Sequence, residues 1–402
     1  MTIWGFLIKF PGALWNVAGL FVLLILFWEF GVTWLRRLSR RMRYGKPLKP
    51  DERATADAYH GAEWTGPYFA EISKIELTWA PFVQWQQRPF HGTYITIDER
   101  KLRTTPGENS AGKDAIRVYC FGASTMFGVG AREDWTIPAI LQRRLTEAEH
   151  RVSVTNCSQL GYNSSQELIE LQQLLKQGDV PQIAVFYDGI AEIISAEWSG
   201  RAGAMLSEEV RRAEFNLLRA NRRRDLVLAA LVAAMPRTLR RLREWTGLSL
   251  RGPVPSTAGV TLRDEEIPAL ARAVVDVYAA NVRMARVLAI GYGFKALFFW
   301  QPVITTKRIK SPDEQRWESS MLADIAARRR LFAAVLDEYR RHPDLKGAPD
   351  TADLSATFDD QAEPVYIDIA HLSEAGNVVI AEAMLPTIEA AVAAAKNRKA
   401  TV

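Results

Sequence analysis

Two places far apart in the sequence have the side chains that nucleophilic catalysis needs, Ser124 in one and Asp368 with His371 in the other. Ser124 follows the apolar run Val118–Gly122, and a strand that hands a serine to a tight turn presents its hydroxyl near backbone N–H groups that can bind an oxyanion. Asp368 precedes His371 by three residues, so its carboxylate can orient the imidazole, whose other nitrogen can accept the serine proton. On the Ser124 stretch alone, a glycine-punctuated turn with an incidental serine explains the pattern equally well. The distant acid–histidine pair favours the chemical interpretation.

The elements that must position these residues alternate between strand and helix from residue 116 onward. Such alternation predicts a three-layer α/β/α fold with a parallel, flavodoxin-like sheet. The carboxyl ends of parallel strands share one edge, so the serine and the acid–histidine pair should meet there. The predicted strands are 116–121, 152–156, 182–187, 295–300 and 365–367, and the predicted helices are 136–148, 165–177, 267–290 and 373–395.

The serine turn differs from the usual nucleophile elbow of α/β-hydrolases, Gly-x-Ser-x-Gly, because Met126 stands two residues after Ser124. Gly122-Ala123-Ser124, with Gly128 four residues after the serine, is similar instead to a Gly-Asp-Ser block. The aspartate of that block is not a member of the triad, so the alanine in its place leaves the predicted triad intact.

Two further stretches complete the similarity. Residues 156–164 include Gly161 shortly after the second predicted strand, and Asp368 with His371 form an Asp-x-x-His block. Together these motifs resemble the SGNH (GDSL-type) hydrolase family over residues 116–395, apart from an insertion. Residues 298–303 resemble the fourth strand of membrane-anchored members. The resemblance implies acyl transfer by Ser124, His371 and Asp368, with the N–H groups of Ser124 and Gly161 as the oxyanion hole.

One block departs from the family pattern. Gly-x-Asn-Asp/Glu appears as Gly189-Ile190-Ala191-Glu192, so Ala191 stands where an asparagine would donate its side-chain N–H to the oxyanion. Losing one such donor costs about 10²–10³ in turnover. Three readings stay open: a substitute donor such as Asn163, a slow enzyme, or an inert module that binds or scaffolds.

The resemblance implies a serine esterase, O-acyl hydrolase or acyltransferase that needs no metal and no organic cofactor. The ester could belong to a small molecule, a glycan or a lipid. Histidine is scarce, with 5 in 402 residues, and the two cysteines, Cys120 and Cys157, lie in apolar or small-residue stretches that suit buried free thiols. The net charge of +5 comes from local clusters and gives no support for a nucleic-acid partner.

The N-terminus predicts a single-pass membrane anchor. Between residues 10 and 35 the only charged residue is Glu29, and the stretch is long enough for a helix of about 20 residues across a bilayer. Trp15, Trp28 and Trp34 lie towards its ends, as interfacial anchors do. The residues at the C-terminal end of this stretch contain no small-x-small site that a signal peptidase could cleave. Arginines and lysines at 36–46 place the catalytic domain in the cytoplasm of a bacterial-type cell by the positive-inside rule, with a periplasmic domain as the alternative.

The expected organisation is therefore an anchor with a basic juxtamembrane segment (1–43), a lead-in (44–115) and a hydrolase domain (116–398). The lead-in is rich in aromatic residues and proline and reads as extended chain packed on the main domain, with one short strand at 92–98. An arginine-rich segment around an apolar run, 196–262, reads as an inserted helical cap. Its basic surface could bind an anionic lipid or glycan, or simply be solvated.

Overall fold

The computed structural model describes residues 51–208, 211–212, 215, 262–320 and 325–401. The predicted anchor (1–43) and most of the predicted insertion (196–262) lie outside the described residues. The described residues within 50–208 and 258–402 belong to one compact unit, which contains the sheet and the described part of the lead-in, residues 51–115.

The centre of this unit is a parallel sheet of five strands in the order β6-β5-β7-β8-β9. That order is the flavodoxin-like one, with the chain switching direction across the sheet after its first two strands. Four of the five strands fall within one or two residues of their predicted positions, since they are the buried apolar runs of the sequence. The strands are β5 (Ile116–Gly122), β6 (Val152–Asn156), β7 (Ile183–Asp188), β8 (Lys295–Trp300) and β9 (Thr351–Asp353).

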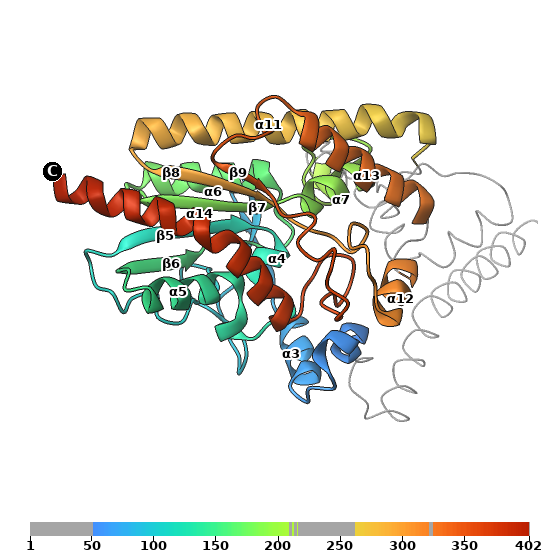
Figure 1. Cartoon of the computed structure of the whole chain (residues 1–402), viewed down its shortest axis with the longest axis horizontal. Helices are drawn as coiled ribbons and strands as arrows, with labels where there is room; N and C mark the ends of the chain where they lie inside the picture. The colour runs from blue at the N-terminus through green and yellow to red at the C-terminus, as the bar shows by residue number, and fades with distance from the viewer. Residues whose placement is uncertain (1–50, 209–210, 213–214, 216–261, 321–324, 402) are drawn as a thin grey trace, which may run out of the picture. The chain divides into compact units, whose positions relative to one another are not determined.

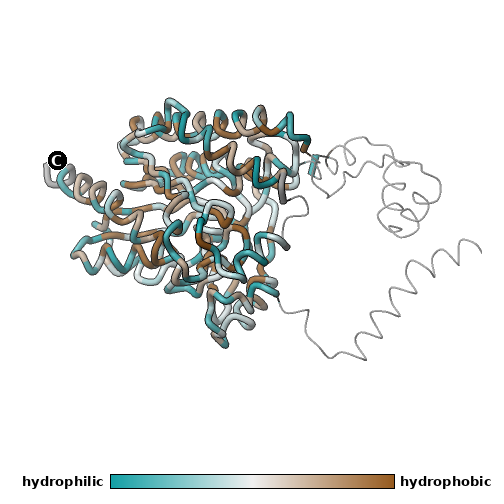
Figure 2. The backbone as a smooth tube through the Cα atoms, turned by 45° about the vertical axis from the view of Figure 1, so that its right-hand side comes forward, coloured by the Kyte–Doolittle hydropathy of each residue, from teal (hydrophilic) through white to brown (hydrophobic). Residues whose placement is uncertain are grey.

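Helices cover both faces of the sheet, as the alternating pattern predicts (Figure 1). Alternate residues of β5 point to opposite cores: Val118 and Cys120 pack with one set of helices, Tyr119 and Phe121 with the other. One face is covered by α5 (Ile137–Glu147) and α14 (Glu374–Thr401). The other face is covered by α6 (Ser164–Lys176), α7 (Ile190–Ser199), α11 (Ile267–Tyr292) and α13 (Ile325–Arg341). The long helix α11 alternates between hydrophobic and hydrophilic residues along its length (Figure 2), as an amphipathic covering helix requires.

The prediction of a last strand at 365–367 was wrong. These residues are buried, but they form only an isolated bridge between Tyr366 and Leu372. The N–H groups of Val365 and Tyr366 instead donate to the Glu314 carboxylate, at 3.0 and 3.3 Å. A side-chain acceptor thus replaces the neighbouring strand. The fifth strand is β9, whose three residues carry no apolar run that the sequence could reveal.

The lead-in has more regular structure than the predicted extended chain. Its elements are the 3₁₀ turns η2 (Glu52–Thr55) and η3 (Asp57–Tyr59), helix α3 (Thr65–Ile72), and the hairpins β1 (Leu77–Ala80) with β2 (Gln84–Gln87) and β3 (Phe90–His91) with β4 (Thr96–Ile97). The predicted strand at 92–98 is therefore the turn and second strand of a hairpin. The remaining short elements are α4 (Ser124–Phe127), η4 (Glu133–Trp135), η5 (Asp264–Glu266) and α12 (Pro312–Ser320).

Cys120 and Cys157 are free and buried, as predicted. Within the described ranges, one helix is long and apolar enough to cross a membrane by length and composition, residues 374–397 of α14. Some of its apolar residues, among them Ile380, Met384 and Ile388, are buried in the core on one face of the sheet.

Candidate active site

The three residues singled out by type and spacing meet at the carboxyl edge of the sheet. The Ser124 Oγ lies 2.7 Å from His371 Nε2, and His371 Nδ1 lies 2.6 Å from Asp368 Oδ2. We call this chain of contacts, Ser124–His371–Asp368, the relay. Ser124 and His371 are partly accessible to solvent, whereas Asp368 is buried with 2% of its surface exposed. A nucleophile that substrate can reach, backed by a base and a buried acid, is the arrangement of a serine hydrolase triad.

Asp368 is oriented by its own loop before it meets the histidine. Its Oδ1 accepts hydrogen bonds from the N–H groups of Ala370 (3.0 Å) and His371 (2.8 Å), which leaves Oδ2 for the imidazole. Burial opposes ionisation, but contact with His371 and Arg53 outweighs it, so the pKa of Asp368 is held below its ordinary value. The ionised form of Asp368 is therefore favoured, and its Oδ2 can accept a hydrogen bond from a protonated His371 Nδ1.

The turn that carries Ser124 needs a glycine before it. A Cβ at Gly122 would lie 2.5 Å from Met126 Cβ and 3.1 Å from the Tyr187 carbonyl oxygen. The loop after α4 is held by buried groups of the lead-in: Arg103 donates to the carbonyls of Phe127 (3.0 Å) and Gly128 (2.8 Å), and Tyr68 donates to Gly128 (3.0 Å). Ser124 thus lies on a tightly packed turn, and buried side chains of the lead-in hold the loop that follows it.

The loop that follows β6 brings Gly161 to the same edge. The Gln159 N–H donates to the Gly122 carbonyl at 3.1 Å, which docks this loop against the turn before Ser124. Gly161 has φ +76°, the left-handed conformation that favours glycine. Its N–H has no acceptor among the described residues. The carbonyl of the same peptide group, that of Leu160, accepts a 2.8 Å hydrogen bond from the Trp85 indole N–H. Trp85 therefore fixes the orientation of the peptide that would donate to an oxyanion.

Asn163 has a different task from the substitute donor considered on sequence grounds. Its side-chain oxygen caps α6 by accepting from the Gln166 N–H (3.3 Å), and its amide nitrogen donates to the Ala204 carbonyl (2.9 Å). The side chain is buried, and both of its polar ends are engaged. We therefore leave Asn163 out of the proposed oxyanion hole.

The block that departs from the family pattern, Gly189–Glu192, forms the start of α7. Ala191 is the second residue of α7, half-buried, and has no side-chain donor. Glu192 faces inward, where its carboxylate accepts from the N–H groups of Gly189 (2.9 Å) and Ser164 (2.6 Å). Glu192 therefore ties the starts of α6 and α7 together.

Two further buried acids lie beneath this junction. Burial, followed by the charge of its neighbours, raises the pKa of both Glu167 and Asp188 well above the ordinary values. Neither oxygen of Glu167 makes a hydrogen bond of normal length. Burial thus disfavours the ionised form of both carboxyl groups, and neither makes a hydrogen bond to Ser124, His371 or Asp368 among the described residues.

Sequence reasoning missed three contacts to the site. Arg53 contacts Asp368 Oδ2 at 3.3 Å, Trp85 holds the Leu160 carbonyl, and the Thr125 hydroxyl donates to the Gln301 side-chain oxygen at 2.8 Å. Gln301 follows β8, and its N–H also donates to the Asp188 carbonyl. No local pattern marks these residues, because each is brought to the site by tertiary packing.

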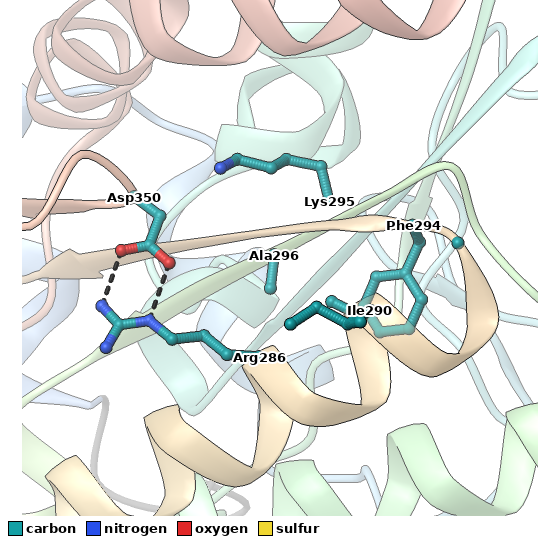
Figure 3. A pocket seen from close by; sticks show the side chains of 8 residues that line it. Arg286, Ile290, Phe294, Lys295, Ala296 and Asp350 are labelled. Carbon is teal, nitrogen blue, oxygen red and sulfur yellow. Dashed lines mark hydrogen bonds and ion pairs between the residues drawn. The ribbon is translucent and has the colours of Figure 1, made fainter. Parts of the chain in front are cut away.

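A hollow of about 420 Å³ lies elsewhere (Figure 3). It is lined by Arg286, Lys295 and Asp350 among others, and Lys295 is the first residue of β8. It therefore opens at the amino ends of the strands, away from the relay. In the described part of the chain no group of three or more His, Cys, Asp or Glu side chains is arranged to hold a metal ion.

No family model and no curated protein matches this chain. Among solved structures it is similar to an acetyl xylan esterase (13% identity, TM-score 0.34), covering 68% of this chain and 100% of the other. It is also similar to TesA (16% identity, 68% and 99% coverage, TM-score 0.34). A third is a lipolytic protein of the G-D-S-L family from Veillonella parvula (13% identity, 68% and 97% coverage, TM-score 0.35). Likenesses at this level carry no argument about function, which has to come from the geometry of the site.

Proposed function

We propose that this protein is an SGNH-type serine hydrolase that cleaves or transfers an acyl group at an ester bond. The observation that supports this most is the relay from Ser124 through His371 to Asp368, with two consecutive contacts of 2.7 and 2.6 Å. Ser124 and His371 are 247 residues apart in the sequence, whereas Asp368 and His371 are 3 residues apart. The first contact pairs a hydroxyl with a ring nitrogen that can accept its proton, and the second pairs the other ring nitrogen with a carboxylate oxygen that can stabilise the imidazolium.

The first half of the reaction forms an acyl-enzyme. Ser124 Oγ attacks the ester carbonyl carbon while its proton passes to His371 Nε2, and the carbonyl oxygen becomes an oxyanion. The N–H groups of Gly161 and of Ser124, the first residue of α4, are the proposed donors to that oxygen. The bond to the alcohol oxygen then breaks, and the imidazolium returns its proton to the leaving alkoxide. Asp368 stabilises the imidazolium throughout.

The second half reverses these roles. Water, or a sugar hydroxyl in a transferase, attacks the acyl carbon, gives its proton to His371 and displaces Ser124, which is reprotonated. Every proton and bond is accounted for by the chain and its two substrates, so the proposed route uses no metal or cofactor. Hydrolysis and transfer differ only in which hydroxyl enters after the alcohol leaves.

We further propose, from sequence alone, that residues 1–43 anchor the enzyme in a membrane and that its ester belongs to a glycan or a lipid. The excess of positive residues after the predicted span favours a catalytic unit on the cytoplasmic side of the membrane. A role on exported glycans would require it on the periplasmic side. A phosphatase or a fluorescent protein fused after Val402 separates the two orientations, because each reporter is active on one side only.

The direct test is hydrolysis of a short-chain p-nitrophenyl ester by the full-length chain. We expect turnover that the Ser124→Ala variant reduces to the background rate while its thermal unfolding stays unchanged. Equal rates for the wild type and the variant would refute the proposed activity.

A second candidate is a catalytically inert module that binds an acylated glycan or scaffolds a membrane complex. It is favoured by Ala191, which offers no donor, and by Asn163, whose amide is engaged elsewhere. This candidate predicts binding of an acetylated oligosaccharide that Ser124→Ala leaves unchanged, together with no ester turnover by either protein.

A further inference from the structure

Arg53, at the start of the described chain, reaches the acid of the relay. Its guanidinium NH1 lies 3.3 Å from Asp368 Oδ2, the same oxygen that faces His371 Nδ1 at 2.6 Å. In Figure 1 the blue η2 segment lies beside the loop that leads into α14. Arg53 belongs to the lead-in, outside the residues that resemble the hydrolase family. One carboxylate oxygen therefore serves two cationic partners, the imidazolium that forms during reaction and a permanent guanidinium.

The guanidinium is held in place by contacts of its own. Its Nε and NH2 bond the two oxygens of Asp51 at 3.0 and 2.8 Å, and its carbon lies 4.9 Å from the centre of the Phe69 ring. Its side chain is 22% exposed, against 3% for that of Asp368. An ordered charge in a partly desolvated position acts on its neighbours more strongly than a mobile surface charge does.

We propose that Arg53 is a positioning residue for the proposed reaction: it fixes Asp368 Oδ2 toward His371 and limits how strongly the acid favours the imidazolium. This inference rests on the proposed hydrolase function. It makes the lead-in a part of the active site, since the segment that follows the predicted anchor then sets the pH range over which His371 acts as a base.

The sign of the effect follows from the groups around the pair. Asp51 and Arg53 of the lead-in, Tyr59 of η3 and Ser124 of α4 face Asp368 and His371. Burial raises the pKa of Tyr59, so it stays neutral, and contact with Arg53 leaves the pKa of Asp51 lowered despite burial. The charged groups among these are two carboxylates and one guanidinium, and the Glu374 carboxylate, which also acts on Tyr59, is paired with Arg132. Removing the Arg53 guanidinium therefore leaves a net negative charge around the pair, which favours the protonated imidazole.

The experiment is the pH dependence of kcat/KM for a short-chain p-nitrophenyl ester, measured with the full-length chain as wild type, Arg53→Met and Arg53→Lys. A unit charge about 6 Å away in a medium between protein and water shifts a titration by roughly 0.5–2 pH units. We expect the acidic limb of the profile to move up by about that amount in Arg53→Met and to return most of the way in Arg53→Lys. Arg88→Met is the matched control, because Arg88 pairs with Glu76 in an exposed position.

A second readout does not need turnover. The Cε1 proton of His371, assigned with His371→Gln among only five histidines, reports protonation directly by NMR. We expect the midpoint of its transition to rise in Arg53→Met and not in Arg88→Met. Superimposable wild-type and Arg53→Met transitions, in a chain that is folded, would overturn the inference. A shifted transition in a chain without esterase activity would uphold the role of Arg53 and refute the proposed function instead.

Discussion

Replacing Asp368 with asparagine tests the relay in a way that the structure makes specific. The Asp368 Oδ1 accepts two backbone N–H groups, at 3.0 and 2.8 Å, so the asparagine oxygen has to take that position. Its NH₂ group then stands where Oδ2 faced His371 Nδ1 and Arg53 NH1. A donor now faces two donors, and the imidazole can make a hydrogen bond there only by moving its proton to Nε2.

An Nε2–H tautomer cannot accept the proton of Ser124, which lies on that side at 2.7 Å. A triad in which the acid is replaced by its amide loses about 10³–10⁴ in kcat, equivalent to about 4–5.4 kcal/mol of transition-state stabilisation. The assay is kcat for a p-nitrophenyl ester at pH 7–8, with substrate saturation to separate kcat from KM. We expect kcat to fall and KM to stay within about threefold.

The same variant carries a prediction about stability. The pKa of Asp368 is lower in the fold than in the unfolded chain, so its ionised form stabilises the fold above the unfolded pKa of about 3.9. That contribution is lost as the pH falls through the folded pKa. The stability difference between wild type and Asp368→Asn should therefore be constant above about pH 5 and shrink in stronger acid.

The kinetic prediction has its own refuting outcome. An Asp368→Asn variant that keeps more than a tenth of wild-type kcat would show that Asp368 does not act through His371.

Three other changes have defined outcomes. Trp85→Phe removes the hydrogen bond to the Leu160 carbonyl and should lower kcat about tenfold, which is less than the loss of a direct oxyanion donor costs. Trp79, the exposed cross-strand neighbour of Trp85, provides the control, and Trp79→Phe should leave kcat unchanged. Equal kinetics for the two variants would rule out the role of Trp85. Glu167→Gln removes a buried carboxyl whose pKa is raised in the fold, and such a group makes the wild type lose stability as the pH rises. The Tm of the variant relative to that of the wild type should therefore increase from pH 5 to pH 9. Parallel pH dependences of the two Tm values would contradict this prediction. Lys307→Met removes the partner that lies 2.7 Å from the Glu314 carboxylate, whose side chain has no exposed surface. Urea unfolding should show that the free energy of unfolding falls by about 3–5 kcal/mol. A fall of less than about 1 kcal/mol would contradict this prediction.

The buried strands could be predicted from sequence because each is a short apolar run bounded by turn residues. Strands β6 and β8 occupy the predicted residues, and β5 extends the prediction by one residue. Strand β9 could not be found, because Thr351–Asp353 is only three residues long and has a single apolar residue, Ala352. Residues 365–367 looked like a strand for the opposite reason. They are apolar and buried, but the Glu314 carboxylate accepts the N–H groups of Val365 and Tyr366, and the Ile367 N–H donates to the His371 carbonyl.

The relay was predictable because two of its three residues lie close together in the sequence and one of them is of a scarce type. Histidine is so scarce that His371, three residues after Asp368, stood out. Arg53 was not predictable, since 315 residues separate it from the oxygen it contacts, and arginine is common in this chain. Trp85 was hidden among the aromatic residues of the lead-in, which looked like packing. The spacing of catalytic groups is a local property, whereas the contacts that orient them depend on the tertiary fold.

The central claim, that Ser124 is an activated nucleophile, is tested most directly by a fluorophosphonate that labels serines only when a neighbouring base takes their proton. Intact-mass analysis of the full-length chain should show one phosphonyl adduct, and peptide mapping should place it on Ser124. Labelling should be lost in Ser124→Ala and slowed strongly in His371→Gln. An unlabelled wild-type chain, or an adduct that persists in Ser124→Ala, would contradict the account.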